Sequence, residues 1–577
     1  MPLPVFTTPV NKNLAVLDRK EWQMMTPAPL ATAAAMFVIH PPPYLASASG
    51  VGSNSTVVGS NYPAMYVASA TVAYLYYPDQ DAWSQVPSPA LAGTFGAGAN
   101  GTFSPWSITY TATGGSTTTV TVAAASFNLS GAVVGKTIEF LSAGTATGQR
   151  RIITAIDSNA GTGTITLTLD YAVATAILNT HTFRVSSGRY FVMSAGTTTA
   201  GSWKVFDLGT YTWQASLATA TLAATWATDG QSACTARHAN VLYNGAAASG
   251  STTTLVDSTA NWGVNQWAGA YVLLVSGTGA GQCIKILSNT ATTLTFATVT
   301  TAPAAATVYQ IRALGALSSG VATGGSATTL VNSAKNWVVN AWTNYQVRII
   351  SGTGAGQKSK ISSNTATTLT IASGAAIDTT SVYEIEPLED SIYMIGNNAV
   401  TMYLYSIAGN TWSVVAPTTA RAAAPTTGES LDFVAHTLDP LWASETATLG
   451  VQEGRYLYSY RAGASTVVDR FDIAGGTAGA GAWTAITNPV ATETFTTGSS
   501  AVWQGRYLYI RKDATNRFFR YDIPANEFVG FNTDLYPDGA ALLGQKIWAR
   551  SLDGTEQLTW LYSLANTGTV LRRVGIV

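Results

Sequence analysis

The chain has 577 residues, a net charge of −1 and only 10% charged side chains, against about 25% in an average domain. This charge balance offers no basic surface for nucleic acid or an anionic membrane. The sequence also contains no apolar run of about 18 residues, the length needed to span a bilayer. The 47% hydrophobic and 10% aromatic content excludes a disordered chain. So little charge has two explanations: a surface covered by other subunits, which would favour a large assembly, or a surface that Thr, Ser and Asn keep hydrated.

The first 29 residues are predicted to form an arm that ends in a single outer strand within residues 18–25. They lack a basic segment followed by an apolar one, so we expect no secretory signal. The two cysteines, Cys234 and Cys283, are too few for a disulfide scaffold. We expect both to be reduced, buried thiols of a protein made in a cytosol.

A triplet of predicted strands recurs along the chain from about residue 65 onward. A first strand rich in Tyr is followed by a second that ends near an acidic residue, then by a turn and a third strand that begins with an aromatic residue. Two clear examples are GRYLY (454–458) followed by DRFD (469–472), and GRYLY (505–509) followed by FRYD (519–522). Further triplets begin near residues 65, 189, 391 and 545.

These triplets resemble the blades of kelch-type β-propellers, in which a G-x-x-(I/L)-Y-(I/V) strand precedes a strand ending in Tyr-Asp and a turn with Asn-x-Trp. The resemblance covers about six blades, although the double glycine of the family is missing and the spacings are irregular. It implies an all-β fold: a propeller of about six blades that stack radially, so that each blade covers the faces of its neighbours. The strand within residues 18–25 would close the ring against the last blade.

A second repeat interrupts the triplets. Residues 251–296 match residues 326–371 at a constant offset of 75, including the motif SGTGAGQ (276–282 and 351–357) and the motif SNTATTLT. A more divergent third copy lies at about 114–186. Alternating strands and turn clusters at this spacing predict a small barrel or sandwich of five or six strands. The glycine-rich motif lacks the Gly-Lys-Ser/Thr and the helix of a phosphate loop, so we interpret it as a hairpin turn.

Both repeats together divide the chain into seven segments. One module would interrupt a blade between Trp106 and Arg189. The other two, in tandem, would interrupt the next blade between His238 and Ser391. All three modules should therefore project from the same face of the propeller. The predicted segments are an arm and closing strand at 1–29, propeller parts at 30–110, 188–245 and 389–577, and inserted β-modules at 111–187, 246–314 and 315–388.

Few residues suggest chemistry. The four histidines, His40, His181, His238 and His436, have no metal-ligand spacing and are interpreted as structural. The one acidic cluster, at 384–390, contains Glu384, Glu386, Glu389 and Asp390 and is interpreted as a solvated linker.

The remaining motifs are also interpreted as structural. Residues 551–554 (SLDG) match a sialidase Asp-box only in part, because the Gly is misplaced. Tryptophans at fixed module positions, such as Trp262 and Trp337, are expected in cores rather than on sugar platforms. We therefore predict no catalytic, cofactor-binding or metal site, no cofactor and no enzyme, and we leave any binding site unassigned.

The module pattern resembles β-modules of phage tail and fibre-associated proteins. This resemblance implies a bacteriophage virion structural protein that is made in the host cytoplasm and is located in the tail (nozzle, baseplate or fibre attachment). Its partners would be other virion proteins of tail, collar or capsid, with cyclic or multi-copy assembly. The alternatives are a capsid decoration protein, a propeller that binds host surface glycan during attachment and, less favoured, a propeller enzyme.

Overall fold

The computed structural model describes residues 100–193 and 241–386 with short gaps, and elsewhere chiefly the strands named below. Within these residues the fold is all-β, with one short 3₁₀ turn at Gly144–Ala146 and no α-helix. Among them, no helix is long and apolar enough to cross a membrane.

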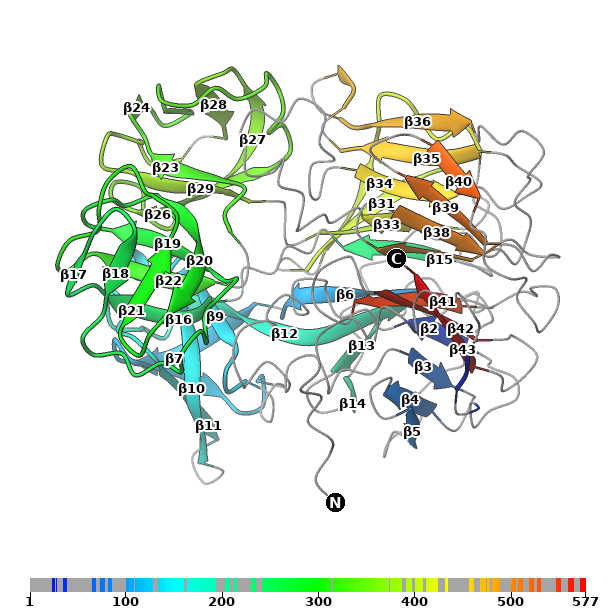
Figure 1. Cartoon of the computed structure of the whole chain (residues 1–577), viewed down its shortest axis with the longest axis horizontal. Helices are drawn as coiled ribbons and strands as arrows, with labels where there is room; N and C mark the ends of the chain where they lie inside the picture. Colours follow the sequence, from blue (N-terminus) through cyan, green and yellow to red (C-terminus); the bar gives the residue numbers. More distant parts are fainter. Residues whose placement is uncertain are drawn as a thin grey trace.

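Six sets of four antiparallel strands form one part of the molecule (Figure 1). Five sets are separate sheets, and the second listed continues through β12 into a larger sheet. In hydrogen-bonded order they are β2 (Ala35–Val38), β3 (Met65–Ala68), β4 (Ala73–Tyr77), β5 (Ala82–Gln85); β6 (Asn100–Trp106), β12 (Thr182–Met193), β13 (Trp203–Asp207), β14 (Thr212–Gln214); β15 (Gly230–Cys234), β30 (Ser391–Gly396), β31 (Met402–Ser406), β32 (Thr411–Val415); β33 (Leu431–Phe433), β34 (Tyr456–Tyr460), β35 (Val467–Asp472), β36 (Ala482–Thr487); β37 (Ser500–Gln504), β38 (Tyr507–Arg511), β39 (Phe518–Asp522), β40 (Glu527–Gly530); and β41 (Lys546–Ser551), β42 (Thr559–Leu564), β43 (Leu571–Ile576), β1 (Gln23–Met24).

One strand of each set contacts its counterparts in two other sets. β2 lies against β6 and β41, β6 also lies against β15, β15 against β33, and β37 against both β33 and β41. These contacts run through all six sets and return to the first. At the chain ends, β1 pairs antiparallel with β43 through Gln23–Arg573 and Met24–Arg572, so an amino-terminal strand completes the sheet of carboxyl-terminal residues.

Three further groups of strands, here called modules 1, 2 and 3, share one strand order. In module 1, pairings run round a closed ring of six strands, as in a barrel, because β12 pairs with both β7 and β9. Module 1 holds β7 (Tyr110–Gly115), β8 (Thr119–Ala123), β9 (Thr137–Ser142), β10 (Arg150–Asn159), β11 (Thr164–Leu169) and the start of β12; module 2 holds β16 (Val241–Ala246), β17 (Ser249–Gly250), β18 (Thr254–Val256), β19 (Tyr271–Ser276), β20 (Cys283–Asn289), β21 (Thr293–Phe296) and β22 (Val308–Arg312); module 3 holds β23 (Ser318–Val321), β24 (Gly324–Gly325), β25 (Thr329–Val331), β26 (Gln346–Ser351), β27 (Lys358–Asn364), β28 (Thr368–Ile371) and β29 (Val382–Glu386).

Each module has its own apolar core, and the repeated motifs build it. Trp262 and Trp337 are buried, which confirms the core interpretation of these residues. The asparagine of each SNT motif anchors the loop that carries the second tryptophan. Asn364 accepts a hydrogen bond from the backbone N–H of Trp342 (2.8 Å) and donates to two carbonyl oxygens, and Asn289 does the same in module 2.

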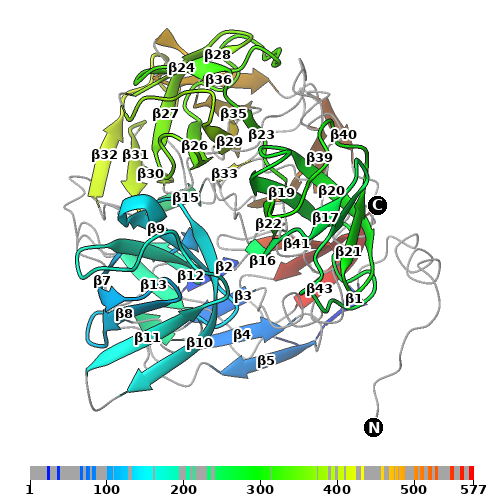
Figure 2. The same ribbon diagram turned by 90° about the vertical axis from the view of Figure 1, so that its left-hand side faces the viewer.

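The glycine-rich motifs of modules 2 and 3 are turns between antiparallel strands, β19–β20 and β26–β27, so their interpretation as hairpins is confirmed. Module 1 lies in the chain between β6 and β12, and modules 2 and 3 lie between β15 and β30. All three gather on one side of the six sheet sets, at the left of Figure 1, and Figure 2 shows them side by side from that direction.

Candidate functional site

The largest concentration of described ionisable side chains lies where the three modules meet. In each module, three adjacent strands carry one side chain each at the same register, and we call these three side chains the seam row. The rows are Arg150, Glu139 and Arg184 in module 1; Cys283, Leu273 and Gln310 in module 2; and Lys358, Arg348 and Glu384 in module 3.

Glu139 links modules 1 and 3. Its carboxylate lies 2.6 Å from Arg184 Nη2 and 2.6 Å from Lys358 Nζ, and 3.6 Å from Arg150 Nη2. The guanidinium of Arg184 stacks over Trp106 of β6, with its central carbon 4.1 Å from the ring centroid. The seam is therefore fastened to the β6–β12 strands as well as between modules.

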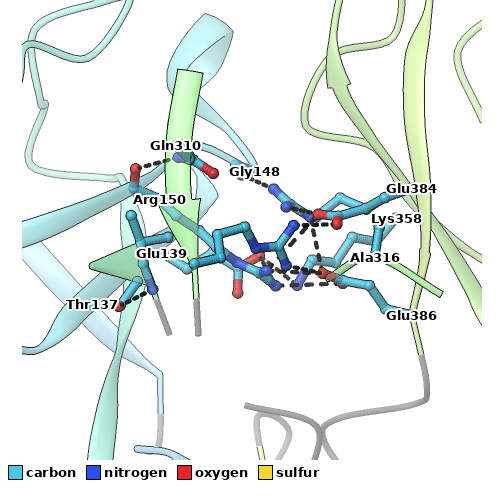
Figure 3. Close-up of polar contacts among 12 residues, drawn as sticks. Thr137, Glu139, Gly148, Arg150, Gln310, Ala316, Lys358, Glu384 and Glu386 are labelled. Carbon is cyan, nitrogen blue, oxygen red and sulfur yellow. Dashed lines mark hydrogen bonds and ion pairs between the residues drawn. The ribbon is translucent and has the colours of Figure 1, made fainter. Parts of the chain in front are cut away.

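Glu384 and Glu386 of β29 form ion pairs with arginines from all three modules. Figure 3 shows this meeting point, with Arg150, Glu384 and Glu386 labelled. Glu384 pairs with Arg348 of its own row and, at 2.5 Å, with Arg312 of module 2. Glu386 accepts two hydrogen bonds from Arg150 of module 1, at 2.8 and 3.3 Å. This two-pronged contact fixes the orientation of both planar groups, which makes it a strong form of ion pair.

The acidic cluster at 384–390 is thus not a solvated linker where the structure describes it. Glu384 is fully buried and Glu386 is 3% exposed. The interpretation was wrong because the cations that neutralise these carboxylates come from distant parts of the sequence, Arg312 being 72 residues and Arg150 236 residues away. Glu389 and Asp390 lie outside the described residues.

The electrostatics hold the seam carboxylates in their charged form. Burial, the largest single influence, would by itself raise the pKa of Glu139, Glu384 and Glu386. The neighbouring arginine and lysine side chains outweigh it and lower the pKa of all three below the ordinary value. These carboxylates therefore accept hydrogen bonds within the seam and do not store a transferable proton at neutral pH.

Backbone contacts between modules depend on the same glycine-rich turns. Gly356 has φ +89°, and a Cβ there would lie 2.1 Å from the carbonyl oxygen of Thr147 in module 1. A Cβ at Gly281 of module 2 would meet the backbone of Gly320 in module 3 at 2.5 Å. Glycine is needed at both positions for the modules to approach this closely.

The other contacts between modules include a polar contact of modules 1 and 2 and an apolar contact of modules 2 and 3. Asp170 of module 1 accepts a hydrogen bond from the Asn244 side chain of module 2 at 2.8 Å, and burial raises the pKa of Asp170. A small apolar cluster centred on Leu273, Ile350 and Val382 joins modules 2 and 3. Module 3 also reaches the end of β35, where the Asn344 side chain donates to the carbonyl of Ile473.

A pocket of about 470 Å³ lies between the glycine-rich turns of modules 1 and 3. Its lining includes Thr147, Gln357 and Lys358. Lys358 is the most exposed of the paired seam side chains, at 19%. The Gln357 side-chain oxygen is buried and has no hydrogen-bond partner among the described residues. The pocket thus connects the surface with the edge of the buried charges.

The remaining residues singled out by the sequence are single structural groups where they are described. His181 is buried, and its Nδ1 accepts a hydrogen bond from the Leu178 backbone, which confirms its structural interpretation. Cys283 forms no disulfide among the described residues and is only half-buried, so its expected burial was wrong. His40, His238, His436, the side chain of Cys234 and residues 552–554 lie outside the described residues. Among the described residues no group of three or more potential metal ligands occurs.

No protein-family model matches the chain, and no curated protein matches it. Among solved structures it is similar to the phage phi92 endosialidase (10% identity, 96% of this chain and 69% of that chain, TM-score 0.24). It is also similar to an auxiliary nutrient binding protein from Bacteroides thetaiotaomicron (9%, 83% and 98%, TM-score 0.22) and to the GH74 xyloglucanase from Xanthomonas campestris (8%, 96% and 99%, TM-score 0.20).

Proposed function

We propose that the chain is a structural protein of a bacteriophage virion, associated with the tail, and that it acts by assembly and display rather than by catalysis. Its architecture in this proposal is a six-bladed, kelch-like propeller with three inserted modules, divided near the boundaries predicted from the sequence. The unbroken succession of contacts from β2 through β6, β15, β33 and β37 to β41 supports a ring, and the β1–β43 pairing supports its closure.

The observation that carries the proposal is the fusion of three modules into one block. Charged side chains of the seam pair with one another across modules, so their chemistry serves to hold a shape. A block of this kind on one side of the six sheet sets provides a fixed surface for a neighbouring subunit. The low charge content of the chain is consistent with such coverage, in several copies or a cyclic assembly.

Immunogold electron microscopy of phage particles tests the proposal directly. Antibodies raised against the purified chain should label intact particles produced from the genome that encodes it, and the label should lie on the tail. Antibodies pre-adsorbed with the purified chain are the control. Label over the head would indicate a capsid decoration protein instead, and particles without label would contradict a role in the virion.

A second candidate function is binding of host surface glycan. The pocket between modules 1 and 3 favours it, because about 470 Å³ lies within the roughly 300–1,000 Å³ of small-ligand sites. The unpartnered oxygen of Gln357 could accept a hydrogen bond from a sugar hydroxyl. A glycan array probed with the purified chain tests it: binding that Gln357→Ala abolishes would support a carbohydrate site at this pocket.

A further inference from the structure

Modules 2 and 3 share most of their core positions, although Tyr345 of module 3 is buried where module 2 has Ala270. Both have the same strand order, and each buries two tryptophans at the same positions of the repeat. Trp267 and Trp342 even make the same hydrogen bond, each donating its backbone N–H to the asparagine of an SNT motif. Two modules with the same strand order in one chain can exchange places with each other or with those of a neighbouring copy, since exchange of like elements has a low energetic cost.

The two modules do differ at the seam. The row of module 2 is neutral, whereas the row of module 3 carries two cations and one carboxylate. Two residues further along the last strand, module 2 has Arg312 where module 3 has Glu386. These side chains are buried, apart from the half-buried Cys283 and the 19% exposed Lys358. The copies thus share most of their core positions but carry different charge patterns where they meet.

Each place in the block accepts only one of the two charge patterns. Arg150 of module 1 needs a carboxylate partner where Glu386 lies, and Arg312 of module 2 needs one where Glu384 lies. A module 2 barrel in the place of module 3 would put a neutral Gln and an Arg there. Arginines would then face one another without water, which is strongly unfavourable for buried charges.

We infer that the charges of the seam rows assign modules 2 and 3 to their places and prevent exchange of modules within a chain and between copies. Each wrong arrangement of the modules would bring like charges into contact, and this repulsion selects the correct arrangement. The selection does not depend on how much the seam contributes to overall stability. The inference concerns the three modules alone and holds whether or not the chain belongs to a virion. It would let many copies be made side by side without entanglement.

The test gives module 3 the module 2 residue at three of the four seam positions that differ, in the full chain, as Arg348→Leu, Glu384→Gln and Glu386→Arg combined, and keeps Lys358. The matched control, Ala334→Thr with Ala376→Thr, also installs residues of module 2, but at exposed positions away from the seam. Each variant is co-expressed in two forms with different affinity tags. After purification on the first tag, the second tag measures the fraction of complexes that contain both chains.

We expect the seam variant to increase this mixed fraction by about tenfold or more over wild type, which corresponds to at least about 1.4 kcal/mol, and the control to leave it unchanged. Cross-linking followed by mass spectrometry should then show contacts between module 1 of one chain and module 3 of the other.

A second variant covers the case in which the triple substitution aggregates. Glu384→Gln with Glu386→Gln removes the two carboxylates that distinguish module 3 at the seam and keeps Arg348, so it should also raise the mixed fraction above that of wild type. A mixed fraction equal to wild type in both seam variants would overturn the inference. So would an equal rise in the exposed control, since the effect would then come from any change in module 3.

Discussion

Replacing Glu384 by Gln is the sharpest test of how the modules are held together. Gln keeps the size of the side chain but removes its charge, and it turns one acceptor oxygen into a donor that faces arginine. Glu384 is fully buried and pairs with Arg348 and, at 2.5 Å, with Arg312. Both guanidinium groups would keep their charge and lose their main partner.

The magnitude follows from what remains after the substitution. Removing one member of a buried ion pair destabilises by about 3–5 kcal/mol, because the other charge stays buried and uncompensated. Here Glu386 still lies 3.5 Å from Arg348 Nε and 3.9 Å from Arg312 Nη2 and can compensate in part. We therefore expect Glu384→Gln to lower the free energy of opening of the block by about 3 kcal/mol, the lower end of this range.

Hydrogen exchange measured by mass spectrometry is the suitable assay, because a chain of several cores need not unfold in one step. Peptides from β22, β26 and β29 should lose protection in Glu384→Gln, while peptides from β38 and β39 should not. Asp157→Asn, at an exposed position of β10, is the control for loss of a carboxylate in the modules. Unchanged protection of β29 in Glu384→Gln would show that the seam charges do not hold the modules together.

Four further predictions follow from other contacts. Gly356→Ala should destabilise more than Gly269→Ala, as measured by urea unfolding, since both have φ near +90° but only at Gly356 does the new Cβ collide with a neighbouring module. Asn364→Ala should cost module 3 about 2–3 kcal/mol, because a buried backbone N–H loses its partner, and exchange of the Trp342 amide would report it. Deleting residues 1–25 should expose the edge of β43 and raise aggregation, seen by light scattering, while the modules keep their exchange protection. The pKa values of the seam glutamates in the folded protein are below the unfolded value of about 4.3. Their stabilising effect should therefore be complete above about pH 5 and be lost as the pH falls below about 4. Light scattering or hydrogen exchange measured against pH would contradict this if the modules separate near pH 6.

Strands and repeats could be predicted from the sequence because their signals are local. Alternation of Tyr with Leu, Ser or Ile marks strands such as β34 and β38, and the constant offset between two copies marks modules 2 and 3. The role of the glycine-rich turn was predicted only in part. A hairpin explains why glycine is present, but the need for it at Gly356 comes from Thr147, which lies in another module.

The seam could not be predicted in the same way, because no segment of the sequence contains both members of its ion pairs. Four acidic residues within 384–390 with no cation beside them are typical of a solvated loop. One signal was nevertheless present. Most positions of modules 2 and 3 match, but Leu273 of module 2 corresponds to Arg348 of module 3, and Gln310 corresponds to Glu384. In each module these two positions are paired on neighbouring strands. Charge differences between copies of a repeat thus indicate where the copies meet.

The seam also bears on how the six sheet sets are held together. The amino-terminal strand joins the last set through only two residue pairs. By contrast, the modules that arise from two consecutive sets, β6–β12 and β15–β30, are joined by buried ion pairs such as Arg150–Glu386 and by close contact of their turns. Module 3 adds the contact of Asn344 with Ile473, beside the next set. Because buried pairs are lost only at a large energetic cost, whereas short edge pairings fray easily, opening should begin at β1 and spread to the modules last.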